Sequence, residues 1–287
     1  MSSLISTQEE DLAEAELAAA ISAAVAAPDS EVLVGLGGAS AMLYFPVKND
    51  LKPQYNEGRR SGEKELVFLY LFIRGLGETI RLMLAEAQAS YTHLASPMGE
   101  PQELAMEWRK RSPNGLTPIM SGLGVPRSEP LCQSSAIIRY LASRYGMDGG
   151  GGELERARCD VLFETARDFK NKAKEIVAGD YSTSGAKGAV ITAGNILKMM
   201  AYMGDVGEET SAMNYGQVQL LNSLLAMDEE RKGCVGELSA PLEEWLQKAA
   251  GRTGIREYLK SGMRFPNVTP QYKFDTGPMI RGDTKKI

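Results

Sequence analysis

The sequence is poor in the two residue types that most often bind metals or transfer protons. It contains one histidine, His93, and three cysteines, Cys132, Cys159 and Cys234, without Cys-x-x-Cys spacing. An odd cysteine count without that spacing argues against a disulfide framework and a zinc site, and favours a reducing compartment. Ser-His-Asp catalysis or a multi-histidine metal site would depend on His93 alone, so we expect neither, and no metal.

Long apolar runs and blocks of one charge are also missing. No apolar run reaches the roughly 18 residues that a membrane crossing needs, so we expect no membrane span. The formal net charge of -5 is spread along the chain without a basic face, which argues against a nucleic-acid partner. Residues 9–16 are rich in acids, unlike the Arg-rich transit peptides of organelles. We therefore expect a cytoplasmic protein, with an organellar location as the alternative.

The first 63 residues have the composition of an extension. Residues 7–27 are rich in alanine, and Ser6 with Glu9 has the spacing of a capping box, so we expect a helix there. Two apolar runs around a Gly37-Gly38 turn and a polar stretch follow over residues 31–64, which we interpret as an appendage and linker.

The next segment alternates strand and helix patterns. Residues 65–73 are almost continuously apolar, as in a buried strand, and residues 78–88 are those of a mostly apolar helix. The elements expected after them are a strand over 91–95, a helix over 101–111, strands over 117–120 and 131–133, and a helix over 134–145. This order predicts a thioredoxin-like αβ domain.

A glycine-rich joint at residues 146–152 separates this domain from a helical remainder. Residues 153–177 have the pattern of a charged amphipathic helix, and the chain stays helix-prone to Lys260. The expected organisation is an extension over 1–63, a thioredoxin-like ligand-binding domain over 64–146 and an all-α domain over 153–287.

Three motifs in one order resemble the tyrosine-type cytosolic glutathione transferases of the sigma, mu and pi classes. They are Tyr70-x-x-x-Arg74-Gly75-x-x-Glu78-x-Ile80-Arg81, then Thr117-Pro118, then Gln133-Ser134-x-Ala136-Ile137-x-Arg139-Tyr140-Leu141. The resemblance implies a thioredoxin-like domain followed by an all-helical domain, with glutathione as co-substrate.

The resemblance assigns Tyr70 the catalytic role. Its hydroxyl matches the family hydroxyl that donates a hydrogen bond to the glutathione sulfur and favours the reactive thiolate. A free thiol has a pKa near ~8.5 and is only slightly ionised at neutral pH. One charge-assisted hydrogen bond of roughly 1.5 to 3 kcal/mol would lower that pKa by one or two units. A core tyrosine without this role is the alternative.

The other matched positions would bind the glutathione backbone. Pro118 matches a cis-proline that turns the backbone groups of Thr117 toward the cysteinyl part, and Gln133 contacts the γ-glutamyl group. Ser134 would cap the helix that begins there, whose N-terminus attracts the γ-glutamyl carboxylate. Leu116 stands where the family has a glutamine, so one side-chain contact of the glutathione site is lost.

Three further residues match family positions that lie outside the three motifs. Trp108 and Arg109 lie where the family places a tryptophan and a basic residue around the glycyl carboxylate. Asp168 matches an acid that reaches across a two-fold interface to the γ-glutamyl ammonium, which implies a homodimer. Packing in the core for Trp108 and a solvated helix face for Asp168 are the alternatives.

The helical part carries one further family motif. Asn214 stands where the family has an N-capping aspartate, and we expect it to cap a helix. Met199, Met200, Tyr202 and Met203 could line a pocket for the electrophile, although a methionine stripe at helical spacing is more often core.

The expected function is that of a glutathione transferase that conjugates glutathione to an apolar electrophile or isomerises one. The alternative is a non-catalytic subunit of a larger assembly that binds a protein partner through residues 1–60. A thiol oxidoreductase would need a Cys-x-x-Cys or an N-terminal active cysteine, which the chain lacks.

Overall fold

The computed structural model describes most of the chain from Glu65 onward, together with the backbone of two earlier strands. The described residues are 32–36, 40–47, 65–71, 73–96, 110, 112–150, 152–203, 206, 209, 211–261 and 264–265. The helix expected over residues 7–27 lies outside them, as does the connection expected over residues 101–111 except for Lys110 and its helical backbone.

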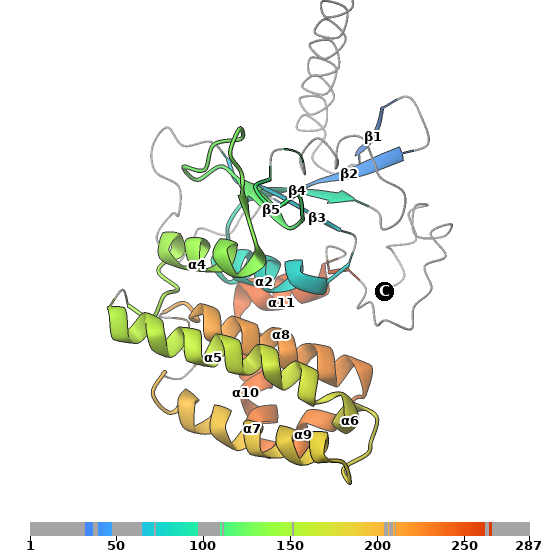
Figure 1. Cartoon of the computed structure of the whole chain (residues 1–287), viewed down its shortest axis with the longest axis vertical. Helices are drawn as coiled ribbons and strands as arrows, with labels where there is room; N and C mark the ends of the chain where they lie inside the picture. The colour runs from blue at the N-terminus through green and yellow to red at the C-terminus, as the bar shows by residue number, and fades with distance from the viewer. Residues whose placement is uncertain are drawn as a thin grey trace, which may run out of the picture.

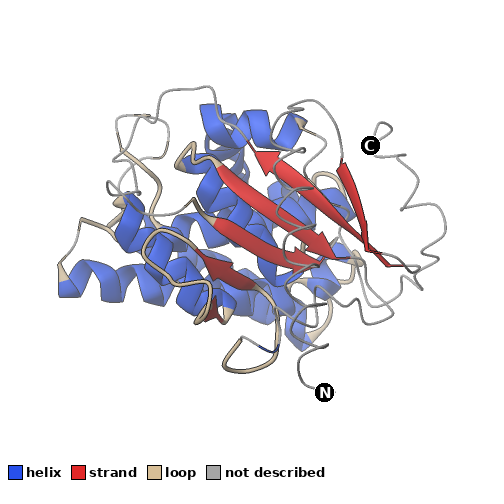
Figure 2. Cartoon of the chain, turned by 90° about the horizontal axis from the view of Figure 1, so that it is seen from above, coloured by secondary structure: helices blue, strands red, loops and turns tan. Residues whose placement is uncertain are grey.

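The described strands form one mixed sheet, seen from above in Figure 2. Their order is β1-β2-β4-β3-β5-β6, and their bounds are Val32–Leu36, Ser40–Val47, Tyr91–Ser96, Val67–Leu71, Ile119–Ser121 and Leu131–Cys132 in that order. Only β3 and β4 are parallel neighbours within this sheet, and the helix α2 connects them. This strand-helix-strand unit is the connection that a parallel pair requires.

Two helices cover the sheet face that looks toward the helical part of the chain (Figure 1). They are α2 (Glu78–Glu86), which follows the short 3-10 turn η1 (Gly75–Gly77), and α4 (Ser134–Tyr145). Every residue of α2 is buried, because this helix has the sheet on one side and other helices on the other. Burial on both sides explains why the sequence after Glu78 is almost continuously apolar.

Residues expected to form an appendage and linker instead extend the sheet. The hairpin β1-β2 pairs with β4 in antiparallel register, with Tyr44 opposite Leu94 and Phe45 opposite His93. In a domain that began at residue 64, β4 would be the edge strand with unpaired backbone groups along one side. The hairpin pairs those groups, so the sheet includes residues from before the boundary placed at residue 63.

The rest of the described chain is helical. The helices are α5 (Glu153–Lys172), α6 (Lys174–Val177), α7 (Ser184–Met200), α8 (Tyr215–Glu230), α9 (Cys234–Leu238), α10 (Ala240–Gly251) and α11 (Thr253–Lys260). A thioredoxin-like domain followed by a helical domain is therefore confirmed. Within the described ranges, no helix combines the length and apolarity that a membrane crossing requires.

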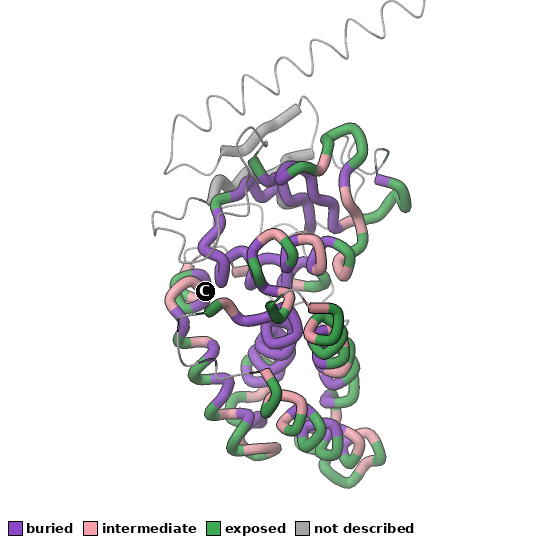
Figure 3. The backbone as a smooth tube through the Cα atoms, turned by 90° about the vertical axis from the view of Figure 1, so that its left-hand side faces the viewer, coloured by how far each residue is buried: buried purple, intermediate pink, exposed green. Residues whose placement is uncertain are grey.

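The helix α8 is the centre of the helical part. The side chain of Asn214 accepts a hydrogen bond from the Gln217 N–H at 3.0 Å, and the Gln217 side-chain oxygen accepts one from the Asn214 N–H at 2.9 Å. This capping box confirms the capping role expected for Asn214. Figure 3 shows buried positions concentrated in the central helices and in the strands above them.

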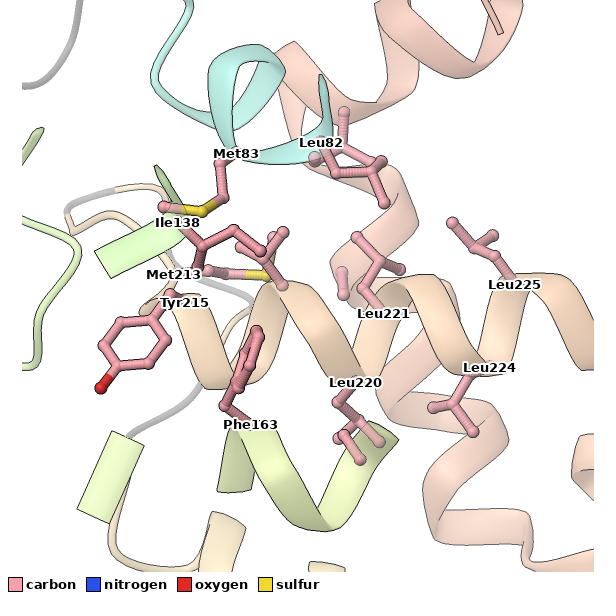
Figure 4. Close-up of a cluster of buried hydrophobic side chains, with 14 of the residues drawn as sticks. Leu82, Met83, Ile138, Phe163, Met213, Tyr215, Leu220, Leu221, Leu224 and Leu225 are labelled. Atoms are coloured by element: carbon pink, nitrogen blue, oxygen red, sulfur yellow. The ribbon is translucent and has the colours of Figure 1, made fainter. Parts of the chain in front are cut away.

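Leucines on opposite sides of α8 connect the two parts of the core (Figure 4). Leu221 points toward Leu82 of α2, whereas Leu220 points toward the helix that carries Phe163, which is α5. These side chains are fully buried, so α8 packs on both sides and joins the small domain to the helical one through one continuous core.

A buried ion pair adds a polar connection between the two parts. Arg252, at the start of α11, donates from Nε to both oxygens of Glu86 at 2.9 and 3.0 Å, and both residues are almost fully buried. The same guanidinium donates to the carbonyls of Val206 and Ser211, and Glu86 also accepts from the Met213 N–H. Glu86 ends α2, so this network fixes one end of that helix.

Removing the charge of Glu86 should strongly destabilise the fold. In Glu86→Gln, the Arg252 charge stays buried without its counter-ion, and we expect the free energy of unfolding to fall by about 3–5 kcal/mol. Chemical denaturation measures this change. The control Glu244→Gln breaks the exposed pair with Lys248 and should change the free energy by less than about 1 kcal/mol. Equal effects of the two variants would contradict the role assigned to the buried pair.

Candidate functional site

Tyr70 lies near the carboxyl end of β3 with its side chain 4% exposed. Its hydroxyl oxygen accepts a hydrogen bond from the backbone N–H of Leu76 at 2.9 Å. Among the described residues, no acceptor for the Tyr70 O–H proton is present. The hydroxyl is therefore oriented by the turn that follows the strand, and its proton remains for another acceptor.

Two glycines of this turn make room for the tyrosine ring. A Cβ at Gly75 would lie 2.5 Å from the Tyr70 hydroxyl oxygen, and a Cβ at Gly77 would lie 2.4 Å from Cδ1 of the ring. Gly75 also has a φ of 38°, in the region that glycine adopts at little cost. The glycine after Arg74 in the motif thus has a steric reason, because the backbone passes directly over the catalytic candidate.

Burial determines the protonation state of Tyr70. It raises the pKa of the phenol above its ordinary value, and the Leu76 hydrogen bond and the charge of Arg81 lower the pKa by less. The phenol is therefore protonated at neutral pH. It can donate a hydrogen bond to an anion, and it is unsuited to act as a base.

Arg81 holds the same turn from inside the protein. Its guanidinium donates to the carbonyls of Leu71 at 3.3 Å and Ile73 at 3.1 Å, and its central carbon lies 5.7 Å from the centre of the Tyr70 ring. The side chain is 1% exposed and forms an ion pair with Glu78 at 3.1 Å. Arg81 is a motif residue to which the sequence assigned no role. Its place in the Tyr70 motif, seven residues after Arg74, was the one sequence feature that pointed to it.

The Thr117-Pro118 bond is cis, as the sequence predicted. Pro118 is buried and Thr117 is half-buried, directly before β5. Leu116 precedes them with its side chain 61% exposed, and its N–H donates to Asn114 at 3.0 Å. The position that replaces the family glutamine therefore presents an apolar side chain to the surface.

The start of α4 differs from the sequence prediction in one respect. Gln133 is the N-cap residue, with no side-chain cap, and Ser134 is the first residue of the helix, so the capping role expected of Ser134 is wrong. The cause is the backbone of Gln133, whose φ of 69° ends β6 and turns the chain into the helix. A non-glycine residue in this region is strained, and such positions cluster at functional sites.

Strand directions bring Tyr70, Thr117 and Gln133 to one end of the sheet. Leu69 in β3 is opposite Ile119 in β5, and Ile119 is opposite Cys132 in β6. Both pairings are antiparallel, so the end of β3, the start of β5 and the end of β6 lie along the same edge. The sequence predicted each of these site residues from a separate motif, and the strand register places the three motifs side by side.

The N-terminus of α4 also faces this edge. Its first intrahelical bond runs from the Ile137 N–H to the Gln133 carbonyl, so the N–H groups of residues 134–136 precede the hydrogen-bonded ladder. Arg167 of α5 donates to the Ser135 hydroxyl at 3.2 Å. Asp168, the next residue of α5, is exposed. The Arg167 guanidinium is itself paired with Glu164 at 3.2 Å, so the groups here that attract a carboxylate are the free amides of the helix N-terminus.

Other residues singled out in the sequence have different positions. Trp108 and Arg109 lie outside the described residues. Three methionines of the suggested electrophile stripe pack against the core, whereas Tyr202 is 76% exposed, and the packed ones are Met199, Met200 and Met203. The core interpretation of the stripe is therefore confirmed for the methionines.

The histidine and two of the cysteines, Cys159 and Cys234, are buried, whereas Cys132 is half-buried and ends β6 directly before Gln133. His93 is fully buried and stacks on Phe68, and burial together with the Arg81 charge holds its pKa well below the ordinary value. All three cysteines are free thiols. Burial raises the pKa of the Cys159 thiol to about 11, so this thiol is unreactive at neutral pH. In the described part of the chain, no cluster of metal-ligating residues is present.

Alanine substitutions at Gly77, which contacts Tyr70, and at Gly194, which has open space around it, should change the free energy of unfolding in opposite directions. Gly77→Ala places a methyl carbon 2.4 Å from Cδ1 of the Tyr70 ring, and we expect the free energy of unfolding to fall by about 1–3 kcal/mol. Gly194→Ala, in α7 with open space around the new methyl, should raise it by about 0.5–1 kcal/mol because alanine favours helix. Chemical denaturation of both variants tests the packing, and stabilisation by Gly77→Ala would contradict it.

Comparison with known proteins agrees with this arrangement. Residues 67–143 match the family model for the glutathione S-transferase, N-terminal domain. The chain is 27% identical to glutathione S-transferase P 1 of Xenopus laevis over 226 residues, covering 72% of this chain and 98% of that protein. It is 26% identical to glutathione S-transferase Mu 4 of Rattus norvegicus over 216 residues, covering 71% and 93%.

Solved structures show the same fold. A pi-class glutathione S-transferase of Onchocerca volvulus superposes with a TM-score of 0.54 at 20% identity, covering 69% of this chain and 93% of that one. The matched N-terminal domain contains Tyr70, Thr117-Pro118 and Gln133-Ser134. Residues 67–143 therefore resemble the glutathione S-transferase N-terminal domain, and most of the chain is similar in sequence to glutathione S-transferases named P and Mu.

Proposed function

We propose that the protein is a glutathione transferase in which Tyr70 promotes attack by the glutathione thiolate on an apolar electrophile. The attack leads either to conjugation of the electrophile or to its isomerisation. One observation carries the proposal: the Tyr70 hydroxyl is fixed by the Leu76 N–H and keeps its own proton. Such a donor stabilises the thiolate over the thiol and lowers the pKa of the bound sulfur. Holding the thiolate next to the electrophile supplies the rest of the rate increase.

Glutathione binding is assigned to the other residues at the same end of the sheet. The backbone of Thr117 before the cis-proline pairs with the cysteinyl part, in the manner of an added strand. Gln133 and the first amide groups of α4, with the Ser134 hydroxyl, bind the γ-glutamyl carboxylate. Trp108 and Arg109 bind the glycyl carboxylate, as the family resemblance implies.

Two exposed leucines support an apolar second substrate. Leu76 is 54% exposed on the turn over Tyr70, and Leu116 is 61% exposed before the cis-proline. Both are attached to segments that carry glutathione-site residues. Exposed apolar side chains at a binding site favour an apolar ligand, whose burial removes their surface from water.

The proposed working form is a homodimer. Asp168 is exposed on α5, and the family resemblance assigns it to the γ-glutamyl ammonium of the partner's site. A two-fold interface along α4 and α5 would place each Asp168 near the other protomer's site. Loss of glutathione affinity in Asp168→Asn, with the dimer intact by sedimentation, supports this assignment.

A non-catalytic subunit is the second candidate, because residues before the small domain have an unusual arrangement. The hairpin β1-β2 adds to the edge of the sheet, and the chain has 31 further residues before it. Deleting residues 1–31 discriminates between the two candidates, since the deletion leaves every described strand of the sheet in the chain. Co-purification with a larger complex that this deletion abolishes favours the subunit, whereas an active dimer unaffected by it favours the enzyme.

Replacing Tyr70 with phenylalanine should impair thiolate formation more than binding. Tyr70→Phe removes one hydrogen bond to an anion, so the pKa of bound glutathione should rise by about one to two units. Conjugation with a chloronitrobenzene at pH 6.5 should then fall by about ten- to a hundredfold. Thiolate absorbance against pH measures the pKa, and the exposed Tyr181→Phe serves as the control. Unchanged activity in Tyr70→Phe would contradict the proposal.

Replacing Ser134 should weaken glutathione binding and leave the thiol pKa alone. Ser134→Ala removes a hydrogen bond to a carboxylate worth about 1.5–3 kcal/mol, so affinity should fall about tenfold or more. Calorimetric titration with glutathione measures the change. Ser184→Ala is the matched control, because Ser184 is likewise the first residue of a helix, α7. Equal affinity in Ser134→Ala and the parent would remove this serine from the site.

A further inference from the structure

A buried carboxylate connects the turn over Tyr70 to the C-terminal end of the described chain. Glu78 is fully buried at the start of α2 and accepts hydrogen bonds from one residue of its own helix and from two residues near the C-terminal end of the described chain. Arg81 donates at 3.1 Å, the Tyr258 hydroxyl of α11 at 3.0 Å, and Arg264 at 3.2 Å. A carboxylate inside a protein is stable only with such partners, so their positions depend on one another.

Arg264 and Phe265, which we call the C-terminal clamp, contact this group from beyond α11. The Phe265 ring is 3% exposed and stacks against the Arg81 guanidinium, whose central carbon lies 4.7 Å from the ring centre. The Phe265 carbonyl accepts a hydrogen bond from Nε of Arg74 at 2.5 Å. The clamp therefore contacts both arginines of the Tyr70 motif.

A second acid secures the clamp from the helical domain. Glu229, near the end of α8, forms ion pairs with Arg74 through one oxygen and with Arg264 through the other. Arg74 and Arg264 would repel each other without it, and the shared carboxylate holds them together. The turn after β3 is thereby bound to α8 and to the clamp.

The contacts of the clamp continue through Arg81 to the catalytic candidate. Arg81 donates to the carbonyls of Leu71 and Ile73, directly before the turn. The turn then supplies the Leu76 N–H that orients the Tyr70 hydroxyl. The turn contains two glycines, which place few restrictions on its backbone, so its geometry depends on contacts from outside.

We propose that Arg264 and Phe265 are positioning residues for Tyr70, and that the C-terminal clamp holds the turn at residues 73–77 in the conformation that fixes the tyrosine hydroxyl. The inference concerns the geometry of the turn, and its catalytic consequence rests on the proposed function. The contacts of the clamp with the tyrosine motif run through Arg74, Glu78 and Arg81. A contact about 190 residues away in sequence thus controls the direction of one hydrogen bond.

Hydrogen exchange at the Leu76 amide tests the geometry without any ligand. In Phe265→Ala and Arg264→Gln, the turn loses its outer support, and the Leu76 amide should exchange at least about tenfold faster relative to amides of β3. Arg264→Lys keeps the charge and should restore part of the protection. The control Leu246→Ala removes a buried side chain of α10, and should destabilise the fold without this selective change.

The thiol pKa of bound glutathione tests the consequence for chemistry. We expect Phe265→Ala and Arg264→Gln to raise it by about one unit, with glutathione affinity within about threefold of the parent, because Thr117 and Ser134 are on other elements. The control Leu246→Ala should lower the melting temperature about as much as these two variants do, and should leave the thiol pKa unchanged. Selective exchange at Leu76 with an unchanged thiol pKa would overturn the catalytic half of the inference.

The failures of the two proposals are distinguishable. If the parent binds no glutathione, or does not lower its thiol pKa, the proposed function fails, and the exchange experiment still decides the structural claim. If the parent lowers the pKa and the Leu76 amide is equally protected in the parent, Phe265→Ala and Arg264→Gln, the positioning role is wrong.

Discussion

The buried charge of Glu78 is the constraint on which the arrangement of the site depends. A carboxylate without access to water must be surrounded by donors, and Glu78 takes these from α2, from α11 and from the C-terminal clamp. Its partner Arg81 in turn binds the backbone before the tyrosine turn. The position of one phenolic hydroxyl thus depends on groups contributed by both domains, so the small domain alone would lack part of what orients Tyr70.

The sheet supplies the other half of the site by topology. Antiparallel pairing of β5 with both β3 and β6 brings three chain ends to one edge, although Tyr70 and Ser134 are separated by a long stretch of sequence. Backbone groups before the cis-proline and at the start of α4 then face the same region as the hydroxyl. Groups of the backbone keep their positions when side chains change, so Leu116 in place of the family glutamine removes one side-chain contact and leaves these groups where they are.

Sequence reasoning recovered what local patterns encode. Apolar strands, the helix after Glu78, the Thr117-Pro118 turn and the Asn214 cap depend on neighbouring residues, and the structure confirms them. Features that depend on distant partners were missed. The pairing of β2 with β4, the Glu86–Arg252 pair and the clamp on Arg81 join segments far apart, and no local period marks them.

Proton release on glutathione binding tests the central claim, that this site binds glutathione and ionises its thiol. Calorimetric titrations at pH 7 in buffers of different ionisation enthalpy measure the protons released per ligand bound. We predict binding of both glutathione and S-methylglutathione, with protons released only by glutathione, because the methylated sulfur has none to lose. Absence of binding, or equal proton release by the two ligands, would contradict the account.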